Sequence, residues 1–178
     1  MILEPTPLPG LLRVRQQRHS DERGFFARTF CAQEFAAAGV TFSPVQMSAS
    51  FSARALTLRG LHWQATPHAE TKLVRVTRGA VFDVAVDLRP GSSTCGRWHG
   101  LRLDAQTGDA LLVPPGFAHG LMTLADDTEV LYAMDVPFVP AAARGARWND
   151  PAFGIDWPAP PAVLAPKDAA WPDWTPAP

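Results

Sequence analysis

Residues 56–64, LTLRGLHWQ, and residues 108–120, GDALLVPPGFAHG, open and close the part of the chain that decides its fold. Between them lie short runs rich in β-branched or aromatic residues: KLVRV, VFDVAVDL and RWHGLRL. These runs are separated by residues typical of turns. No helical period interrupts these runs, and turns recur at the spacing typical of a β-sandwich or barrel. The pattern predicts an all-β scaffold that carries His62, Lys72 and His119.

Composition predicts a single domain over residues 1–178. The chain is 47% apolar and 19% charged, which suits one globular unit with its own core. A formal net charge of −1 provides no field that would attract nucleic acid or an anionic membrane. The two cysteines lie far apart and form no metal or disulfide pattern, so we expect a reducing, cytoplasmic location. The proline-broken start lacks the features of a secretory signal, and no apolar run approaches the roughly 20 residues of a spanning helix.

The flanks are less regular than the centre. Residues 11–19 predict a first strand, the DERG sequence at 21–24 predicts a turn, and residues 33–40 predict a helix that ends at Gly39. Residues 41–52 fit either an irregular strand or a loop. After Pro137 many prolines alternate with tryptophan and phenylalanine, which predicts irregular backbone that covers the barrel, with a helical turn near 167–170. The tryptophans predict packing up to about Trp171, and low-complexity disorder is the alternative for the last few residues.

Aspartates interrupt the apolar run VFDVAVDL. Asp83 and Asp87 share one face of the expected strand, and Phe82, Val84 and Val86 share the other. We therefore expect this strand to be half-buried or to line a polar cavity.

The segment from Gly108 to His119 has the spacing G-x5-P-x-G-x2-H, which resembles the second signature of the cupin double-stranded β-helix. This resemblance implies a cupin-type jelly roll with short peripheral helices and an irregular C-terminal segment. His119 is expected to line a cavity, and a structural histidine is the alternative. Many cupins hold a metal with an H-x-H pair, but Gln64 follows His62 here, so we predict no metal. A three-ligand site of His62, Glu70 and His119 stays as the alternative.

Six ordered blocks carry a more specific resemblance: DERGFF, RGLHWQ, PHAETKLVRVTRGAVFDVAVDLR, VPPGFAHG, EVLY and RWNDPAFGIDWP. Together they resemble the dTDP-4-dehydrorhamnose 3,5-epimerase family over nearly the full chain. The resemblance implies a homodimer that exchanges N-terminal strands and uses neither metal nor cofactor. It also implies epimerisation at C3, C5 or both of a nucleotide-linked 4-keto-6-deoxyhexose in deoxysugar or polysaccharide synthesis.

The residue types fit that chemistry. A ketone at C4 acidifies the protons at C3 and C5, so the reaction needs a base, a group that stabilises an enolate, and an acid on the opposite face. His62 is the expected base, because an ordinary imidazole titrates near pH 6.5. By resemblance, Asp168 orients His62, Lys72 neutralises the enolate and Tyr132 donates the proton.

The resemblance also implies the substrate contacts. Arg23 and Arg59 match the diphosphate-binding positions, and Phe138 matches an aromatic residue that stacks on the base. The remaining expected contacts are Gln46, Ser48, Arg28, Lys167 and His119. Arg28 stands where the family often has a glutamate, Met47–Ser48 replaces a polar pair that includes an asparagine, and Trp63 replaces a common tyrosine.

Two other functions stay open on sequence alone. One is a metal-dependent cupin isomerase or dioxygenase, and the other is a non-catalytic sugar-binding cupin. The sequence leaves open the nucleotide, the sugar, and whether one or both carbons are inverted.

Overall fold

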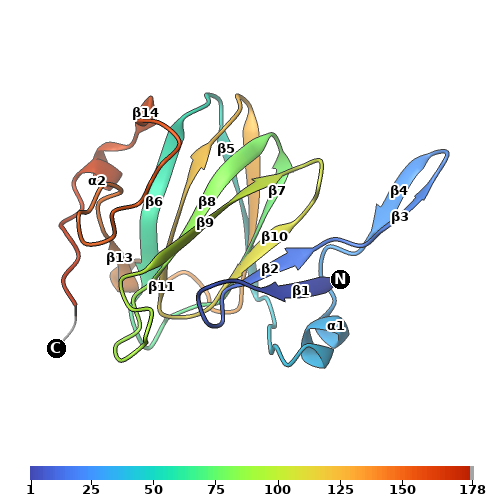
Figure 1. The fold of residues 1–178 in the computed structure, drawn as a ribbon, viewed down its shortest axis with the longest axis horizontal. Helices are drawn as coiled ribbons and strands as arrows, with labels where there is room; N and C mark the ends of the chain where they lie inside the picture. The colour runs from blue at the N-terminus through green and yellow to red at the C-terminus, as the bar shows by residue number, and fades with distance from the viewer. Residues whose placement is uncertain (177–178) are drawn as a thin grey trace.

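The computed structural model describes residues 1–176, and two β-sheets that face each other dominate it (Figure 1). Neighbours in the first sheet follow the order β1 (Ile2–Pro5), β2 (Leu12–Arg15), β10 (Ala110–Val113), β7 (Lys72–Arg78), β12 (Thr128–Met134) and β5 (Gln46–Ser52). The second sheet follows the order β13 (Ala143–Gly145), β6 (Thr57–Gln64), β11 (Phe117–Thr123), β8 (Ala80–Asp87) and β9 (Trp98–Asp104), and β14 (Val163–Leu164) pairs with β6. The predicted all-β jelly roll is confirmed.

The N-terminal region lies to one side of the two sheets. Residues predicted as one strand form two, because the chain leaves the first sheet after β2 and enters a separate hairpin of β3 (Arg18–Asp21) and β4 (Gly24–Ala27). The hairpin turns at the DERG sequence, as predicted, and projects away from the barrel (Figure 1). Helix α1 (Ala32–Ala37) begins and ends earlier than predicted, and Gly39 follows it with φ +76°.

The open question over residues 41–52 is settled by β5, which is an edge strand beginning at Gln46. It pairs with β12 along its whole length, with Ser48 opposite Tyr132 and Gln46 opposite Met134. The pairing matters for the site because it places the β5 side chains in the same rows as those of β12.

The core lies between the sheets and consists of fully buried aliphatic side chains, including Val74, Val81, Leu103 and Leu121. Truncating one such side chain to alanine costs roughly 2–5 kcal/mol in a well-packed core. This rigid interior fixes the positions of the strand ends, where the polar side chains gather.

Strand β8 is buried on both faces, so the half-buried prediction was wrong. Val81 and Ala85 belong to the core between the sheets, while Val84 and Val86 pack beneath the C-terminal segment with Phe153. That segment covers the outer face of the second sheet, as Figure 1 shows. The cover comes from residues more than sixty positions away, which the local pattern of β8 does not reveal.

The C-terminal cover carries a short 3-10 turn, η1 (Pro140–Ala142), and one helix, α2 (Pro166–Ala169), where a helical turn was predicted. Trp174 packs against the outer cluster, so ordered packing extends beyond the predicted limit at Trp171. Disorder was the alternative predicted for the last few residues, and two of these, 177 and 178, lie outside the described residues. No helix within residues 1–176 is long and apolar enough to cross a membrane.

Candidate active site

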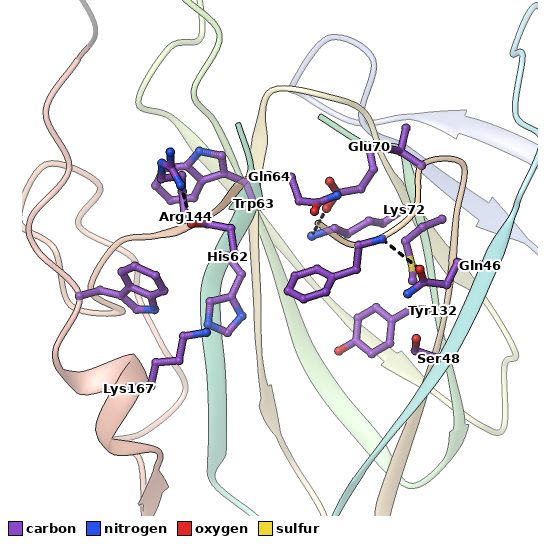
Figure 2. A pocket seen from close by; sticks show the side chains of 15 residues that line it. Gln46, Ser48, His62, Trp63, Gln64, Glu70, Lys72, Tyr132, Arg144 and Lys167 are labelled. Carbon is purple, nitrogen blue, oxygen red and sulfur yellow. Dashed lines mark hydrogen bonds and ion pairs between the residues drawn. The ribbon is translucent and has the colours of Figure 1, made fainter. Parts of the chain in front are cut away.

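A cavity of about 430 Å³ opens between the two sheets, and most of the predicted site residues meet there (Figure 2). Its lining residues are Gln46, Ser48, His62, Trp63, Gln64, Glu70, Lys72, Tyr132, Met134, Val136, Phe138, Ala143, Arg144, Lys167 and Trp171. Most of these residues lie on strands, so the positions of their side chains follow from strand register.

The first wall is built from three neighbouring strands. Gln46 of β5, Met134 of β12 and Lys72 of β7 are direct cross-strand partners. Ser48 and Tyr132 form the next row that faces the cavity, two residues along each strand. Because side chains alternate between the faces of a strand, both rows point the same way.

The second wall carries the first of two histidine–aspartate pairs. His62 lies on β6, and its Nε2 is 2.7 Å from Oδ1 of Asp168 in α2. The other Asp168 oxygen accepts a hydrogen bond of 3.3 Å from the Gly60 backbone N–H. The His62 side chain is 41% exposed and that of Asp168 only 8%, so the imidazole reaches the cavity while the carboxylate stays behind it.

Hydrogen bonds keep Asp168 ionised. Burial by itself raises the pKa of this carboxyl, but the hydrogen bond and charge of His62 and the Gly60 N–H outweigh it, and the pKa lies below its ordinary value. Gly145 is the cross-strand partner of His62, and a Cβ there would meet the Trp171 ring at 2.3 Å. A glycine at this position lets Trp171 pack close beside His62.

Lys72 and Glu70 form an ion pair in the first wall, with 2.8 Å between Nζ and Oε1. Both side chains are largely buried, at 16% and 4% exposure. Figure 2 shows the Glu70 carboxylate turned toward the Lys72 ammonium, beside Gln64.

Tyr132 lies across the cavity from His62 (Figure 2). Burial raises the pKa of its hydroxyl well above the ordinary value, the charge of Asp83 raises it further, and Arg59 opposes them. The phenol is therefore protonated throughout the neutral pH range.

The second histidine–aspartate pair lies behind Tyr132. The His119 ring approaches that of Tyr132 edge-on, with centroids 6.1 Å apart, and its Nε2 is 2.9 Å from Oδ1 of Asp83. Both side chains are buried, and His119 is absent from the cavity lining. His119 lies on β11 of the second sheet and its ring faces Tyr132 of the first, and its predicted contact with substrate stays a prediction.

Two glutamines hold the loop that carries Phe138. Gln46 accepts a 3.0 Å hydrogen bond from the Phe138 N–H, and Gln64 accepts a 2.6 Å bond from the Val139 N–H. The Phe138 ring is 55% exposed at the cavity mouth. An exposed aromatic ring on an anchored backbone is suited to stacking on a flat ligand.

Three predicted arginines lie outside this cavity. Arg59 donates to the Ser52 hydroxyl and the Phe51 carbonyl, at 3.1 and 2.9 Å. Arg23 pairs with Asp21 in the β3–β4 hairpin, and Arg28 pairs with Glu34. Their roles in binding substrate stay predictions.

The three residues of the alternative metal site do not gather. His62 pairs with Asp168, Glu70 with Lys72, and His119 with Asp83. Among residues 1–176, no group of three His, Cys, Asp or Glu side chains is arranged to hold a metal ion.

Sequence reasoning missed several lining residues. Gln64, Met134, Arg144 and Trp171 were not predicted, and Glu70 was considered only as a metal ligand. A usable signal existed for two of them, because Gln64 and Glu70 each lie two positions from a predicted site residue on a strand or at its start. No comparable signal identified Arg144 or Trp171, whose segments fold over the cavity from later in the chain.

Comparison with known proteins bears on what this cavity does. A family model described as dTDP-4-dehydrorhamnose 3,5-epimerase matches residues 5–175. This chain belongs to that family. A dTDP-4-dehydrorhamnose 3,5-epimerase from Sinorhizobium fredii is 45% identical over 160 residues, which cover 89% of this chain and 82% of the relative.

Solved structures of epimerases superpose closely. The Bacillus anthracis dTDP-4-dehydrorhamnose 3,5-epimerase with TDP and PPi bound has a TM-score of 0.94 and 39% identity, covering 97% of this chain and 99% of that one. The Legionella pneumophila dTDP-6-deoxy-D-glucose-3,5-epimerase, in complex with dTDP-4-keto-L-rhamnose, has a TM-score of 0.91 and 37% identity, covering 97% and 92%. The epimerase family resemblance predicted from six sequence blocks is thus confirmed.

Proposed function

We propose that this chain epimerises C3, C5 or both of a dTDP-linked 4-keto-6-deoxyhexose by proton abstraction and reprotonation through an enolate, without a cofactor. The observation that carries the proposal is the His62–Asp168 pair, which presents a hydrogen-bonded imidazole to a cavity with Tyr132 on the opposite side. The family membership supports the same reaction.

His62 is suited to remove the proton. An ionised Asp168 accepts a hydrogen bond from the Nε2–H group, which leaves the Nδ1 lone pair available as the base. When Nδ1 takes a proton from carbon, the electrons of the C–H bond move into the enolate, and the Asp168 carboxylate stabilises the imidazolium that forms.

Lys72 and Tyr132 complete the cycle. The Lys72 ammonium stabilises negative charge on the C4 oxygen, in a wall where burial strengthens the interaction. Tyr132 delivers its hydroxyl proton to the opposite face of the carbon and regains one from solvent, while His62 releases its own. Its raised pKa keeps the donor protonated before each turnover.

Charged and aromatic groups at the mouth support binding of a nucleoside diphosphate. Lys167 lines the cavity and lies 5.5 Å from the centroid of the Trp171 ring, and Phe138 offers a surface for the base. Gln46 and Ser48, which line the cavity on the first wall, are further proposed contacts. The remaining proposed contacts are Arg59 and the N-terminal residues Arg23 and Arg28.

A homodimer with exchanged N-terminal strands explains how Arg23 would reach a site. The β3–β4 hairpin stands away from this chain's own cavity and exposes Phe25 and Phe26, at 54% and 73%. The edge strand β5 exposes Met47 and Phe51, at 62% and 51%. Exposed apolar surface of this kind is typical of an interface. The proposed setting of the dimer is the cytoplasm, as the cysteine content suggests.

Complementation tests the shared site. Arg23→Ala and His62→Asn proteins are each expected to be inactive alone, but a mixture unfolded and refolded together should recover activity. A heterodimer then holds one cavity with a native His62 and a native partner hairpin. Failure to recover activity, with mixed dimers present by mass spectrometry, would contradict strand exchange.

The reaction itself is tested by proton NMR in D2O with dTDP-, GDP- and CDP-linked 4-keto-6-deoxyhexoses. Loss of the C3 or C5 proton signal and appearance of the inverted sugar are expected with the dTDP substrate. The signals that disappear identify the inverted carbons. Tight binding of every substrate without any exchange would instead support a non-catalytic sugar-binding cupin.

A further inference from the structure

Glu70 has a buried oxygen that the proposed chemistry does not use. Its Oε1 pairs with Lys72, whereas its Oε2 is buried and has no hydrogen-bond partner within residues 1–176. Buried carboxylate oxygens are costly to leave without a donor, and the few that remain call for a missing partner. Since Glu70 lines the cavity, a ligand can supply that donor.

The position of Glu70 indicates which donor fits. The inference rests on the proposed function, in which Lys72 contacts the C4 oxygen of the sugar. A carboxylate bonded directly to that ammonium is close enough to reach a substituent on a ring carbon next to C4. Of the two neighbouring carbons, C5 carries a methyl group and C3 carries a hydroxyl, so the C3 hydroxyl is the donor that fits. A hydroxyl donates one hydrogen bond, which is what a carboxylate oxygen accepts.

We propose that Glu70 is a specificity-determining residue that orients Lys72 through Oε1 and accepts a hydrogen bond from the sugar C3 hydroxyl through Oε2. Lys72 then binds the oxygen at C4 while Glu70 binds the hydroxyl at the neighbouring C3. Glu70 thereby selects sugars that carry a hydroxyl next to the ketone and holds the ring in register with His62 and Tyr132.

Substitution by glutamine would reverse one of these contacts. The Lys72 ammonium has only donors, so the amide of Glu70→Gln must turn its oxygen toward Lys72 and its NH2 toward the cavity. The acceptor that faces the sugar becomes a neutral donor. A hydrogen bond to a charged group is worth enough that its loss lowers kcat/KM roughly 10- to 100-fold.

The test compares the parent dTDP-4-keto-6-deoxyhexose with its 3-deoxy analogue, using the rate of proton exchange in D2O at whichever of C3 and C5 exchanges faster in the parent. Wild type is expected to prefer the parent roughly 10-fold or more, and Glu70→Gln and Glu70→Ala to lose most of that preference. Glu129→Gln serves as the matched control, because it changes a carboxylate that accepts a hydrogen bond from Thr77 near the start of β12. This variant is expected to keep the wild-type preference for the parent sugar. Affinity for dTDP alone, measured by calorimetry, should be unchanged in the Glu70 variants.

The outcomes separate this inference from the proposed reaction. Equal exchange rates for the parent and the analogue with active wild type would overturn the C3 contact. The same conclusion would follow if Glu70→Gln lowered the exchange rates of both sugars by the same factor. Absence of exchange at both C3 and C5 with the parent in wild type would instead contradict the proposed reaction. The wild-type comparison needs no substitution, so it decides the matter even if a Glu70 variant fails to fold.

Discussion

Within residues 1–176, two histidine–aspartate pairs differ in exposure more than in geometry. His62 and Asp168 are 2.7 Å apart, and His119 and Asp83 are 2.9 Å apart. The His62 side chain is 41% exposed at the cavity, while that of His119 is 6% exposed behind Tyr132. The two pairs therefore differ in their access to a ligand, because His62 lines the cavity and His119 does not.

The carboxylates also differ in how completely they are bonded. Asp168 uses both oxygens, one toward His62 and one toward the Gly60 N–H, whereas Asp83 has one oxygen without a partner. A fully bonded carboxylate holds its imidazole in one orientation, which proton transfer requires. The charge of Asp83 instead acts on Tyr132, where it contributes to the raised pKa.

The largest expected effect is that of His62→Asn. Loss of the base should lower exchange at C3 and C5 by about 10³-fold, within the usual contribution of general base catalysis. Nucleotide affinity should change little, because the phosphate contacts lie elsewhere. Exchange by NMR and dTDP binding by calorimetry measure the two effects separately. Near wild-type exchange would remove His62 from the role of base.

Tyr132→Phe should separate exchange from inversion. The base still removes protons, but reprotonation from the opposite face loses its donor, so inverted product should fall by about 10²-fold and further than deuterium incorporation. NMR records both in one sample. A parallel fall of both rates would mean that Tyr132 positions the substrate.

Asp168→Asn should be milder, with a roughly 10- to 100-fold loss of exchange, because asparagine still accepts a hydrogen bond but cannot stabilise the imidazolium. The lowered pKa of Asp168 also predicts a pH dependence. A carboxyl with a depressed folded-state pKa stabilises the fold above its unfolded value near pH 4, and this stabilisation is lost as the pH falls further. The Tm difference between wild type and Asp168→Asn should therefore shrink below about pH 4. A constant difference would contradict the ionised Asp168.

The smallest effect is expected at the periphery, for Arg28→Glu. Arg28 is exposed and pairs with Glu34, and ion pairs of this kind contribute little to stability because solvent screens them. If Arg28 contacts the nucleotide of a partner's site, the ratio of kcat/KM for dTDP-, GDP- and CDP-linked sugars should shift by about tenfold or less. An unchanged strong dTDP preference would exclude a role for Arg28 in choosing the nucleotide.

The sequence was a good guide where local pattern and strand alternation suffice. Short β-branched runs predicted the barrel strands, and the family resemblance brought together His62, Lys72, Tyr132 and Asp168, which the structure places around one cavity or directly behind it. It failed for strand β8, because the segment that buries the outer face lies far along the chain. Long-range cover of this kind leaves no periodic signal in the strand that it buries.

The depth of each site residue was equally hard to predict. His119 and His62 are cross-strand partners, yet they differ in exposure because the Tyr132 ring covers only His119. Arg59 was expected at a diphosphate, which stays a prediction, and its guanidinium donates hydrogen bonds to Ser52 and Phe51 of β5. Such details depend on register and on neighbouring side chains, which sequence spacing does not specify.

The most direct test of the division between the two pairs is a side-by-side measurement of deuterium incorporation at C3 and C5 by His62→Asn and His119→Asn. We expect His62→Asn to lose exchange with only a small fall in Tm, because the His62 side chain is 41% exposed and the Gly60 N–H still donates to Asp168. We expect His119→Asn to lose roughly 1–3 kcal/mol of stability, because a buried carboxylate loses its partner, while the folded protein still exchanges protons within about tenfold of wild type. Loss of exchange by about 10³-fold in His119→Asn at unchanged stability, with His62→Asn still active, would contradict the account.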